Sequence, residues 1–258
     1  MKTYSTEHSQ YLKKLKREKH LVLLTQCLLA ISFFGIWEIL AKGNLINTFL
    51  YSYPSKMITT IYSLFLSQQL IHHIGITFYE LMISCGLSFI IGMIFSILLW
   101  FFPFFSKVMD PYLTILNSLP KVALGPLIII WCGANTTSII FMSLLISLFV
   151  TIMNIYQGFM NVPKNYVMMA KSFHASKWQI FYKIILPSNY HSILSTLKVI
   201  LSMNLIGVIM GELLVSKKGL GYLIMYGSQI FHLDLVISCI FLLCIISYLL
   251  YLCINKIK

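Results

Sequence analysis

The chain has 258 residues, of which 59% are apolar and only 10% carry a charge, and its mean hydropathy is +0.86. A soluble domain carries about a quarter charged residues, so this composition excludes a soluble globular protein and predicts an all-α polytopic membrane protein. The net charge of +12 would suit nucleic-acid binding. The lysines lie between apolar segments, however, where membrane topology accounts for them, and no nucleic-acid partner is expected.

Six apolar segments are long enough to cross a bilayer, which takes about 20 residues. They cover about 21–41, 74–101, 109–131, 137–159, 190–214 and 233–254. The first segment has basic flanks but no small-residue cleavage site, which predicts a retained span and not a signal peptide. We therefore divide the chain into a basic tail at 1–20 and a transmembrane domain at 21–258, with a polar loop at 160–188.

The segment between the first two spans is predicted to contain a short helix at the membrane interface. Ile58, Ile61 and Phe65 share one helical face among polar residues. His72 and His73 lack a third ligand, so no metal site is predicted there. The six cysteines lie mostly inside apolar segments without a C-x-x-C pair, which indicates packing and no disulfide or metal site.

The distribution of positive charge predicts the orientation of the spans. With the N-terminus in the cytoplasm, the tail holds six basic residues, the loop at 160–188 four, the C-terminal end two and the segment after the second span one. The external segments hold only four. Because Lys and Arg concentrate in cytoplasmic loops, both termini and the loop at 160–188 are predicted to face the cytoplasm.

Two spans carry stripes of small residues at a four-residue spacing. The stripes are Ser84, Ser88, Gly92 and Ser96 in the second span, and Gly207 and Gly211 in the fifth. Small residues at this spacing let helix backbones approach closely in lipid. We expect them to pack helices of the same chain; the alternative is that one of the stripes forms a dimer interface or lines a path.

The loop at 160–188 is predicted to form two short helices joined by a bend. Pro163 suits the first position of a helix that extends to about residue 172. Ser176 and Gln179 form a capping-box pattern, which predicts a second short helix that starts there and ends before Pro187. The bend would comprise Phe173, His174 and Ala175.

This loop resembles the cytoplasmic coupling loop of bacterial ABC importer permeases, in particular those of the nitrate/sulfonate/taurine group. The family pattern is Glu-Ala-Ala, three residues, Gly, nine residues and Ile-x-Leu-Pro, and here Met168-Met169-Ala170 stands at the triplet and His174 at the glycine. Histidine is among the non-glycine residues enriched at positive φ, so the bend is expected to survive. The resemblance implies an ATPase-docking site at Met168, Met169, Ala170, Phe173, His174, Ala175, Ser176 and Pro187.

Similarity to this family extends over nearly the whole chain from the first span onward. It is carried by Trp37-Glu38, Tyr53-Pro54-Ser55, Asp110-Pro111, 119–127, Trp131-Cys132-Gly133, 210–213 and 219–224. Glu80 departs from it, since the family usually has a basic residue there. The resemblance implies the fold of a type I, MetI-like importer permease in the bacterial cytoplasmic membrane. It also implies import of a small solute by alternating access, either a sulfonate-, taurine- or nitrate-like anion or a vitamin precursor.

The resemblance further implies the partners: ABC ATPase subunits, an extracytoplasmic substrate-binding protein, membrane lipid, and a second permease copy in a homodimer or a heterodimer. ATP and Mg would bind to the ATPase. The chain has no G-x-x-x-x-G-K-[ST] loop and no nucleophile–base constellation, so we expect neither enzymatic activity nor a cofactor. The alternatives are a self-sufficient secondary transporter or channel, which inverted repeats and paired intramembrane charges would favour, and a membrane scaffold.

Lys121, which follows Pro120, and Glu212 are the candidates for the translocation path. A lysine inside a span is costly unless it faces water or a partner. Lys121 is therefore predicted to face the path or the dimer seam, near an anion, unless it pairs with a carbonyl freed by the proline kink or lies nearer the surface. Glu38 and Glu212 map near the external face, where they would contact the binding protein or form solvated helix ends.

Overall fold

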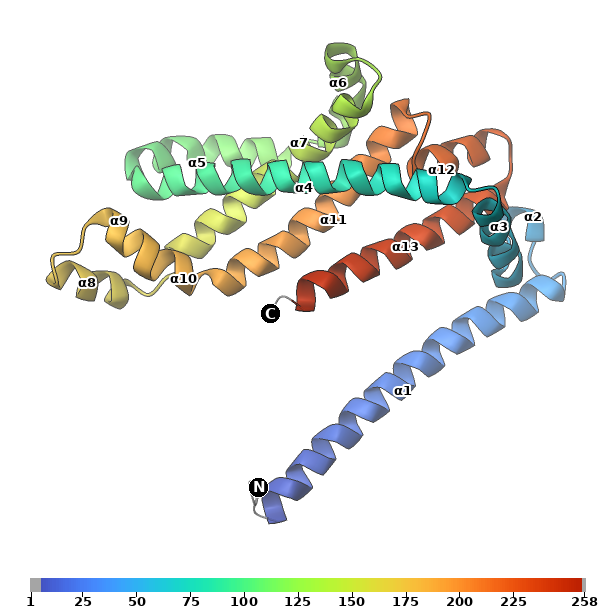
Figure 1. The fold of residues 1–258 in the computed structure, drawn as a ribbon, viewed down its shortest axis with the longest axis horizontal. Helices are drawn as coiled ribbons and strands as arrows, with labels where there is room; N and C mark the ends of the chain where they lie inside the picture. Colours follow the sequence, from blue (N-terminus) through green and yellow to red (C-terminus); the bar gives the residue numbers. More distant parts are fainter. Residues whose placement is uncertain (1–5, 257–258) are drawn as a thin grey trace.

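The computed structural model describes residues 6–256; residues 1–5 and 257–258, including the start of the predicted tail at 1–20, lie outside the described range. Every regular element within that range is a helix (Figure 1), so the all-α class is confirmed. The elements are α1 (Thr6–Lys42), α2 (Thr48–Tyr51), α3 (Pro54–Leu66), α4 (Gln69–Phe101), α5 (Pro103–Ser118), η1 (Lys121–Leu124), α6 (Gly125–Cys132), α7 (Thr136–Met160), α8 (Lys164–Ser172), α9 (Lys177–Ile180), η2 (Phe181–Ile185), α10 (Leu186–Ser188), α11 (Tyr190–Val215), α12 (Leu220–Gln229) and α13 (Leu233–Lys256).

Five described helices are long and apolar enough to cross a membrane, and the number rises to six if one bent pair counts as a span. The five are Lys14–Lys42, Gln69–Phe101, Thr136–Met160, Tyr190–Val215 and Leu233–Lys256. They agree with five of the six predicted apolar segments, and the prediction of about six transmembrane helices is confirmed.

The third predicted span, at 109–131, is not one straight helix. Its first half starts earlier, at Pro103, and α5 meets η1–α6 at a bend of 80°. Leu119 takes an extended conformation, with φ −63° and ψ 141°, immediately before Pro120. The ring of a proline excludes the preceding residue from the helical region, so the chain breaks at this point.

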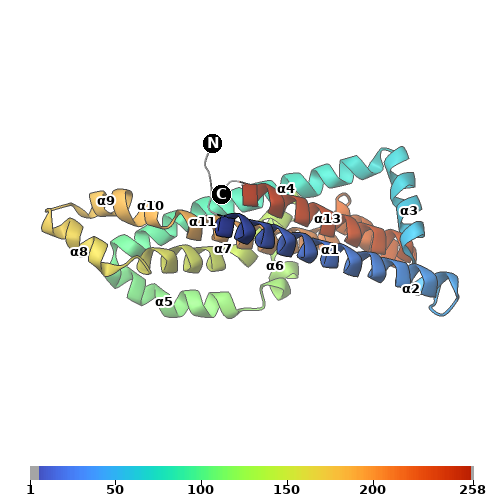
Figure 2. The ribbon, with the colours of Figure 1, turned by 90° about the horizontal axis from the view of Figure 1, so that it is seen from below.

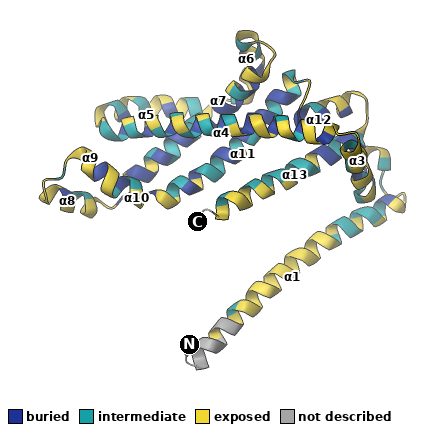
Figure 3. Ribbon diagram, in the orientation of Figure 1, coloured by how far each residue is buried: buried dark blue, intermediate teal, exposed yellow. Residues whose placement is uncertain are grey.

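The centre of the molecule is formed by α4, α7 and α11, which lie side by side with their buried faces together (Figure 3). Asn204 of α11 is fully buried, and its Oδ1 accepts hydrogen bonds from Ser143 Oγ at 2.8 Å and Ser147 Oγ at 3.2 Å, both on α7. Ser88 Oγ of α4 lies 2.6 Å from Ser147 Oγ. Hydrogen bonds between side chains join helices in lipid, where hydrophobicity cannot, so this network links all three.

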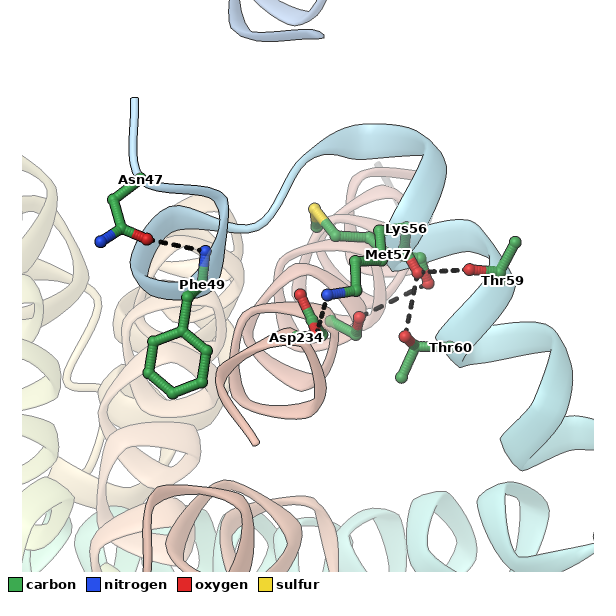
Figure 4. A network of polar contacts seen from close by, with 8 residues as sticks. Asn47, Phe49, Lys56, Met57, Thr59, Thr60 and Asp234 are labelled. Carbon is green, nitrogen blue, oxygen red and sulfur yellow. Dashed lines mark hydrogen bonds and ion pairs between the residues drawn. The ribbon is translucent and has the colours of Figure 1, made fainter. Parts of the chain in front are cut away.

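The predicted interfacial helix is present as α3, which is attached to the start of α13. Lys56 Nζ lies 2.7 Å from Asp234 Oδ2 (Figure 4). Ser238 Oγ donates to the carbonyl oxygen of Met57 at 3.4 Å. Of the predicted apolar face, Ile58 and Phe65 are 68% and 53% exposed, whereas Ile61 is half-buried and packs against residues of α12 and α13. The exposed apolar side chains suit a helix at a membrane interface, but the face is shared between the surface and the protein.

Helix α1 extends away from this body and is exposed along most of its length (Figures 1 and 3). Its C-terminal part is attached to α3, because the Glu38 carboxylate accepts hydrogen bonds from Ser55 Oγ at 2.5 Å and Ser55 N at 3.1 Å. Glu38 also pairs with Lys42 Nζ at 2.9 Å. Glu38 thus remains partly exposed near the end of α1, and its carboxylate in addition joins α1 to α3.

Candidate functional site

The loop at 160–188 forms a helical projection at one end of the molecule, opposite α3 and α12 (Figures 1 and 2). It consists of α8, α9, η2 and α10, and we call residues 164–188 the projection. The predicted first helix is present as α8, which ends at Ser172. Pro163 precedes it as the N-cap, one residue earlier than predicted, with φ −54° and ψ 126°.

The bend in the projection is a Schellman motif, a helix end in which one residue adopts the left-handed conformation. His174 is that residue, with φ +57°. Its N–H donates to the carbonyl of Lys171 at 2.9 Å, and Ala175 N donates to the carbonyl of Ala170 at 3.0 Å. The predicted capping box follows at once: Ser176 Oγ accepts from Gln179 N, and Gln179 Oε1 accepts from Ser176 N at 2.8 Å.

Replacing His174 with glycine is expected to stabilise the bend by about 0.5–1 kcal/mol, because glycine adopts positive φ without the Cβ clash. The amide of Ala175 should then exchange its hydrogen more slowly. Ser172→Gly is the matched control, since Ser172 is the last helical residue of α8 and glycine in a helix costs up to about 1 kcal/mol. Faster exchange in the His174 variant would contradict the left-handed assignment.

The inner side of the projection is anchored on the ends of α4 and α7. Ala170 is only 7% exposed and packs in one buried cluster with Phe159 of α7 and Phe181 of η2. Trp100, near the end of α4, contacts the Phe181 ring at a centroid distance of 5.2 Å, and Phe101 contacts the Trp178 ring at 4.5 Å. The aromatic contacts fix the projection to two membrane-spanning helices, so a force on one is transmitted to the other.

The outer side of the projection is apolar and unusually exposed. Its large side chains are Met168 (58% exposed), Met169 (56%), Phe173 (80%) and Tyr182 (71%). Trp178 contributes to both sides, because it contacts Phe101 and is still 69% exposed. A group of exposed apolar side chains marks an interaction surface, and methionine adapts its shape to a partner. Of the predicted docking residues, His174, Ser176 and Pro187 are also exposed, whereas Ala175 is half-buried and Ala170 is buried.

The second helix of the projection does not end before Pro187, as predicted. Residues 177–188 continue through α9, η2 and α10, and Pro187 lies inside α10. A proline inside a helix lacks the N–H donor and clashes with the carbonyl four residues earlier. The wider π-helical turn at η2 directly precedes it and accommodates the ring, so the chain runs on toward α11.

Both stripes of small residues pack against α7. All four residues of the α4 stripe are buried, and Ser96 Oγ donates to the carbonyl of Ile152 at 3.0 Å. Gly207 and Gly211 of α11 lie against Ser143 and Ile139. A Cβ atom at Gly211 would stand 3.0 Å from the Cα of Ile139, so the backbones of α11 and α7 are in direct contact.

Lys121 lies at the bend that breaks the third span. Its Nζ donates to Asn117 Oδ1 at 3.1 Å and to the carbonyl of Ile146 at 3.3 Å, and it stands 5.6 Å from the centre of the Phe149 ring. The carbonyl belongs to α7 and not to the proline kink. Lys121 is half-buried and Pro120 is exposed, so this segment stays accessible on one side.

Glu212 lies toward the end of the molecule opposite the projection. It is only 1% exposed, so the interpretation of it as a solvated helix end is wrong. Its Oε1 accepts from Thr77 Oγ1 at 2.7 Å and its Oε2 from Gly221 N at 2.5 Å. Gly219 N donates to His73 Nδ1 at 2.9 Å. These groups bind the free N–H groups at the start of α12, as caps do.

Sequence reasoning missed this arrangement. His73 was considered only as half of a histidine pair, and neither Thr77 nor a contact between Glu80 and Glu212 was predicted. His73, Thr77 and Glu80 lie on one face of α4 at the spacing of successive helical turns. A polar stripe at that spacing inside an apolar span is the signal that could have found them. Within residues 6–256 no group of three His, Cys, Asp or Glu side chains is placed to hold a metal ion.

Comparison with known proteins gives one family and several relatives. The family model described as "Binding-protein-dependent transport system inner membrane component" matches residues 88–257. A probable ABC transporter permease protein of Haemophilus influenzae is 29% identical over 90% of this chain and 94% of its own length. The putative aliphatic sulfonates transport permease SsuC of Escherichia coli is 25% identical over 90% and 88%. The formylaminopyrimidine transport permease ThiX of Halalkalibacterium halodurans is 28% identical over 72% and 74%.

Solved structures share the fold at low identity. A chain of a bacterial ABC transporter involved in the import of alginate superposes with a TM-score of 0.65 and 16% identity, over 96% of this chain and 98% of that one. A chain of the inward-facing MetNI methionine ABC transporter gives a TM-score of 0.64 and 16% identity, over 74% and 95%. The predicted MetI-like fold is thereby confirmed.

Proposed function

Because the chain belongs to the family of inner-membrane components of binding-protein-dependent transport systems, we propose that it is the membrane-spanning subunit of an ATP-driven importer. Separate ATPase subunits hydrolyse ATP and bind Mg, and an extracytoplasmic binding protein delivers the solute. Two permease copies, identical or different, form the path and alternate its access between the two sides of the membrane.

The observation that carries this proposal is the projection, with its buried inner side and apolar outer side. Ala170 and Phe181 anchor it to α4 and α7, while Met168, Met169 and Phe173 are turned outward. A rigid element that is fixed to spanning helices and offers an apolar surface can convert movement of a partner into movement of the helices. We infer that the ATPase subunit binds this surface.

The proposed orientation places the N-terminus, the C-terminus and the projection in the cytoplasm. The excess of basic residues in these segments supports it. The course of the helices supports it as well, because α1 and α13 both run from the end that carries α3 in the direction of the side where the projection lies (Figure 1). The bacterial cytoplasmic membrane is the compartment that this arrangement requires.

The proposed cargo is a small solute of the kind named for the relatives, an aliphatic sulfonate or related anion, or a vitamin precursor such as a formylaminopyrimidine. Lys121 is the residue we assign to the translocation path, together with the adjoining Pro120. It is the basic side chain at the break in the third span, and it is partly accessible. Glu212 contributes to the path through the position of α12, since its own carboxylate is buried.

The docking surface is tested with a variant that carries Met168→Ser, Met169→Ser and Phe173→Ser. It is expected to recover at least about tenfold less of a candidate ABC ATPase than wild type does, because a few central side chains carry most of the binding energy of an interface and a combined loss of about 1.4 kcal/mol is tenfold in affinity. The variant should still insert and purify normally, since all three side chains are exposed.

The matched control replaces the same three residues with leucine, which keeps the surface apolar and should keep most of the ATPase bound. Equal recovery by the serine variant and wild type would remove the projection as the docking site. Uptake in vesicles that follows an ion gradient and needs no ATP would favour the secondary-transporter alternative instead.

A further inference from the structure

The end of the molecule opposite the projection holds two buried acidic side chains that lie next to each other. Glu80 of α4 and Glu212 of α11 are each 1% exposed, and the carboxyl group of Glu80 faces that of Glu212 and the side chain of Thr136. Carboxylates are rarely buried without a positive partner, and neither of the two ion pairs among the described residues includes them. The pair therefore needs a physical explanation.

The two carboxyl groups differ in their surroundings. Both oxygens of Glu212 accept hydrogen bonds, one from Thr77 Oγ1 and one from Gly221 N. Gly221 lies in the first turn of α12, where the helix dipole favours a negative charge. Hydrogen bonds to the charged form stabilise it, so the two hydrogen bonds of Glu212 favour its ionised form over that of Glu80.

Glu80 also lies beside the start of a helix, that of α7, but it lacks the hydrogen bonds that Glu212 accepts. Both of its carboxyl oxygens are buried and without a hydrogen-bond partner in the described part of the chain. Neighbouring carboxylates in a buried site cannot both be ionised, because their repulsion adds to the loss of hydration. A neutral Glu80 avoids that cost, and its O–H group becomes a donor.

We propose that Glu80 binds a proton and donates it in a hydrogen bond to the Glu212 carboxylate, so that the pair is a single-proton site holding the start of α12 against α4 and α11. Gly219 is the tightest point of this contact, because a Cβ atom there would overlap the Glu212 carboxyl group. The site is independent of the solute that the permease carries.

The proton can exchange with solvent through an adjoining cavity of about 590 Å³. The cavity is lined by Glu80, Tyr79 and Ile76 of α4, by Asn135 and Thr136 at the start of α7, and by the end of α11 and the residues after it, 215–218. The titratable and charged groups around the pair are His73 and Tyr79 on α4, Glu212 on α11, and the exposed Lys217 and Lys218. Lys217 or Lys218 could neutralise the negative charge of Glu80 in place of a bound proton, so the experiment must distinguish these two possibilities.

The direct measurement is infrared spectroscopy of the purified full-length chain in lipid, which detects the C=O stretch of a protonated carboxyl group. The chain has only seven acidic residues, so the band is assignable. Near neutral pH we expect the band in wild type and its loss in Glu80→Gln. Raising the pH should remove the band from wild type and lower its apparent Tm by roughly 5 °C or more, while Glu80→Gln keeps its Tm.

Two further measurements distinguish a bound proton from a lysine or a metal cation as the group that neutralises Glu80. A Lys217→Gln/Lys218→Gln variant should retain the band and its pH dependence; a band that appears only in this variant would show that a lysine neutralises Glu80 and would overturn the proposal. A wild-type Tm that rises with sodium at constant ionic strength would assign the site to a metal cation instead. Absence of the band in wild type, or failure of Glu80→Gln to fold, would also overturn it, because glutamine is the neutral isostere.

Discussion

Replacing Gly207 with alanine is expected to destabilise the protein by about 2–3 kcal/mol, the usual cost of forcing an extra group into a packed contact. The new Cβ would stand 2.9 Å from the Cβ of Ser143, and the Ser143 backbone lies closer still. This overlap can be removed only if α11 and α7 move apart. Separation would stretch the hydrogen bond of 2.8 Å between Ser143 Oγ and Asn204 Oδ1 in the centre of the bundle.

The same substitution at Gly86 is the matched control. Gly86 lies inside α4, and a Cβ atom there would meet no other atom within 4 Å. Alanine favours a helix by up to about 1 kcal/mol over glycine, so Gly86→Ala should leave Tm unchanged or raise it. Thermal unfolding in lipid nanodiscs compares the two variants. Equal Tm values would show that the separation of α11 and α7 is not set by Gly207.

Replacing Ala170 with aspartate is expected to detach the projection from the bundle. Ala170 is 7% exposed and surrounded by apolar side chains of α7, α9 and η2. A carboxylate placed there has no cationic partner in that cluster, and leaving a charge buried and unpaired costs about 3–5 kcal/mol. The projection should therefore become accessible to protease and to hydrogen exchange, while the membrane-spanning helices remain folded.

Ser172→Asp is the control for that experiment, because Ser172 is exposed on the same short helix. Its expected cost is at most about 0.5 kcal/mol, which is typical of a surface substitution. If the ATPase binds the projection as proposed, Ala170→Asp also abolishes ATP-driven uptake and Ser172→Asp retains it. Protection of the projection in both variants would contradict the anchoring role of Ala170.

The loss of coupling in the Ala170 variant differs from that expected in the Met168, Met169 and Phe173 variant. In the first the surface is lost because its support unfolds; in the second the support stays and the contact is removed. Hydrogen exchange separates the two, since only Ala170→Asp raises the exchange rate of the projection. ATP-driven uptake is therefore expected to need both the buried support at Ala170 and the exposed surface of Met168, Met169 and Phe173.

Local sequence was sufficient for the features that depend on neighbouring residues. The capping box of Ser176 and Gln179 and the left-handed residue His174 were predicted correctly, because both are set by groups within a few positions along the chain. The spans were predicted for the same reason, since hydropathy over about 20 residues determines whether a helix crosses the bilayer. The bend at Pro120 was underestimated, although the restriction on Leu119 is equally local.

What the sequence alone determined is thus the membrane class, the number of spans, the helical bend of the loop at 160–188 and the resemblance that its spacing carries. The tertiary structure decided which faces of these elements meet. It showed that Ala170 supports the projection while its neighbours Met168 and Met169 are exposed, and that Glu80 and Glu212, 132 positions apart in the chain, are buried together. A helical pattern of period 3.6 in the sequence cannot predict that pairing, because the pairing depends on how α4 and α11 pack on α7. In lipid, this packing follows from the close fit of small side chains and not from hydrophobicity.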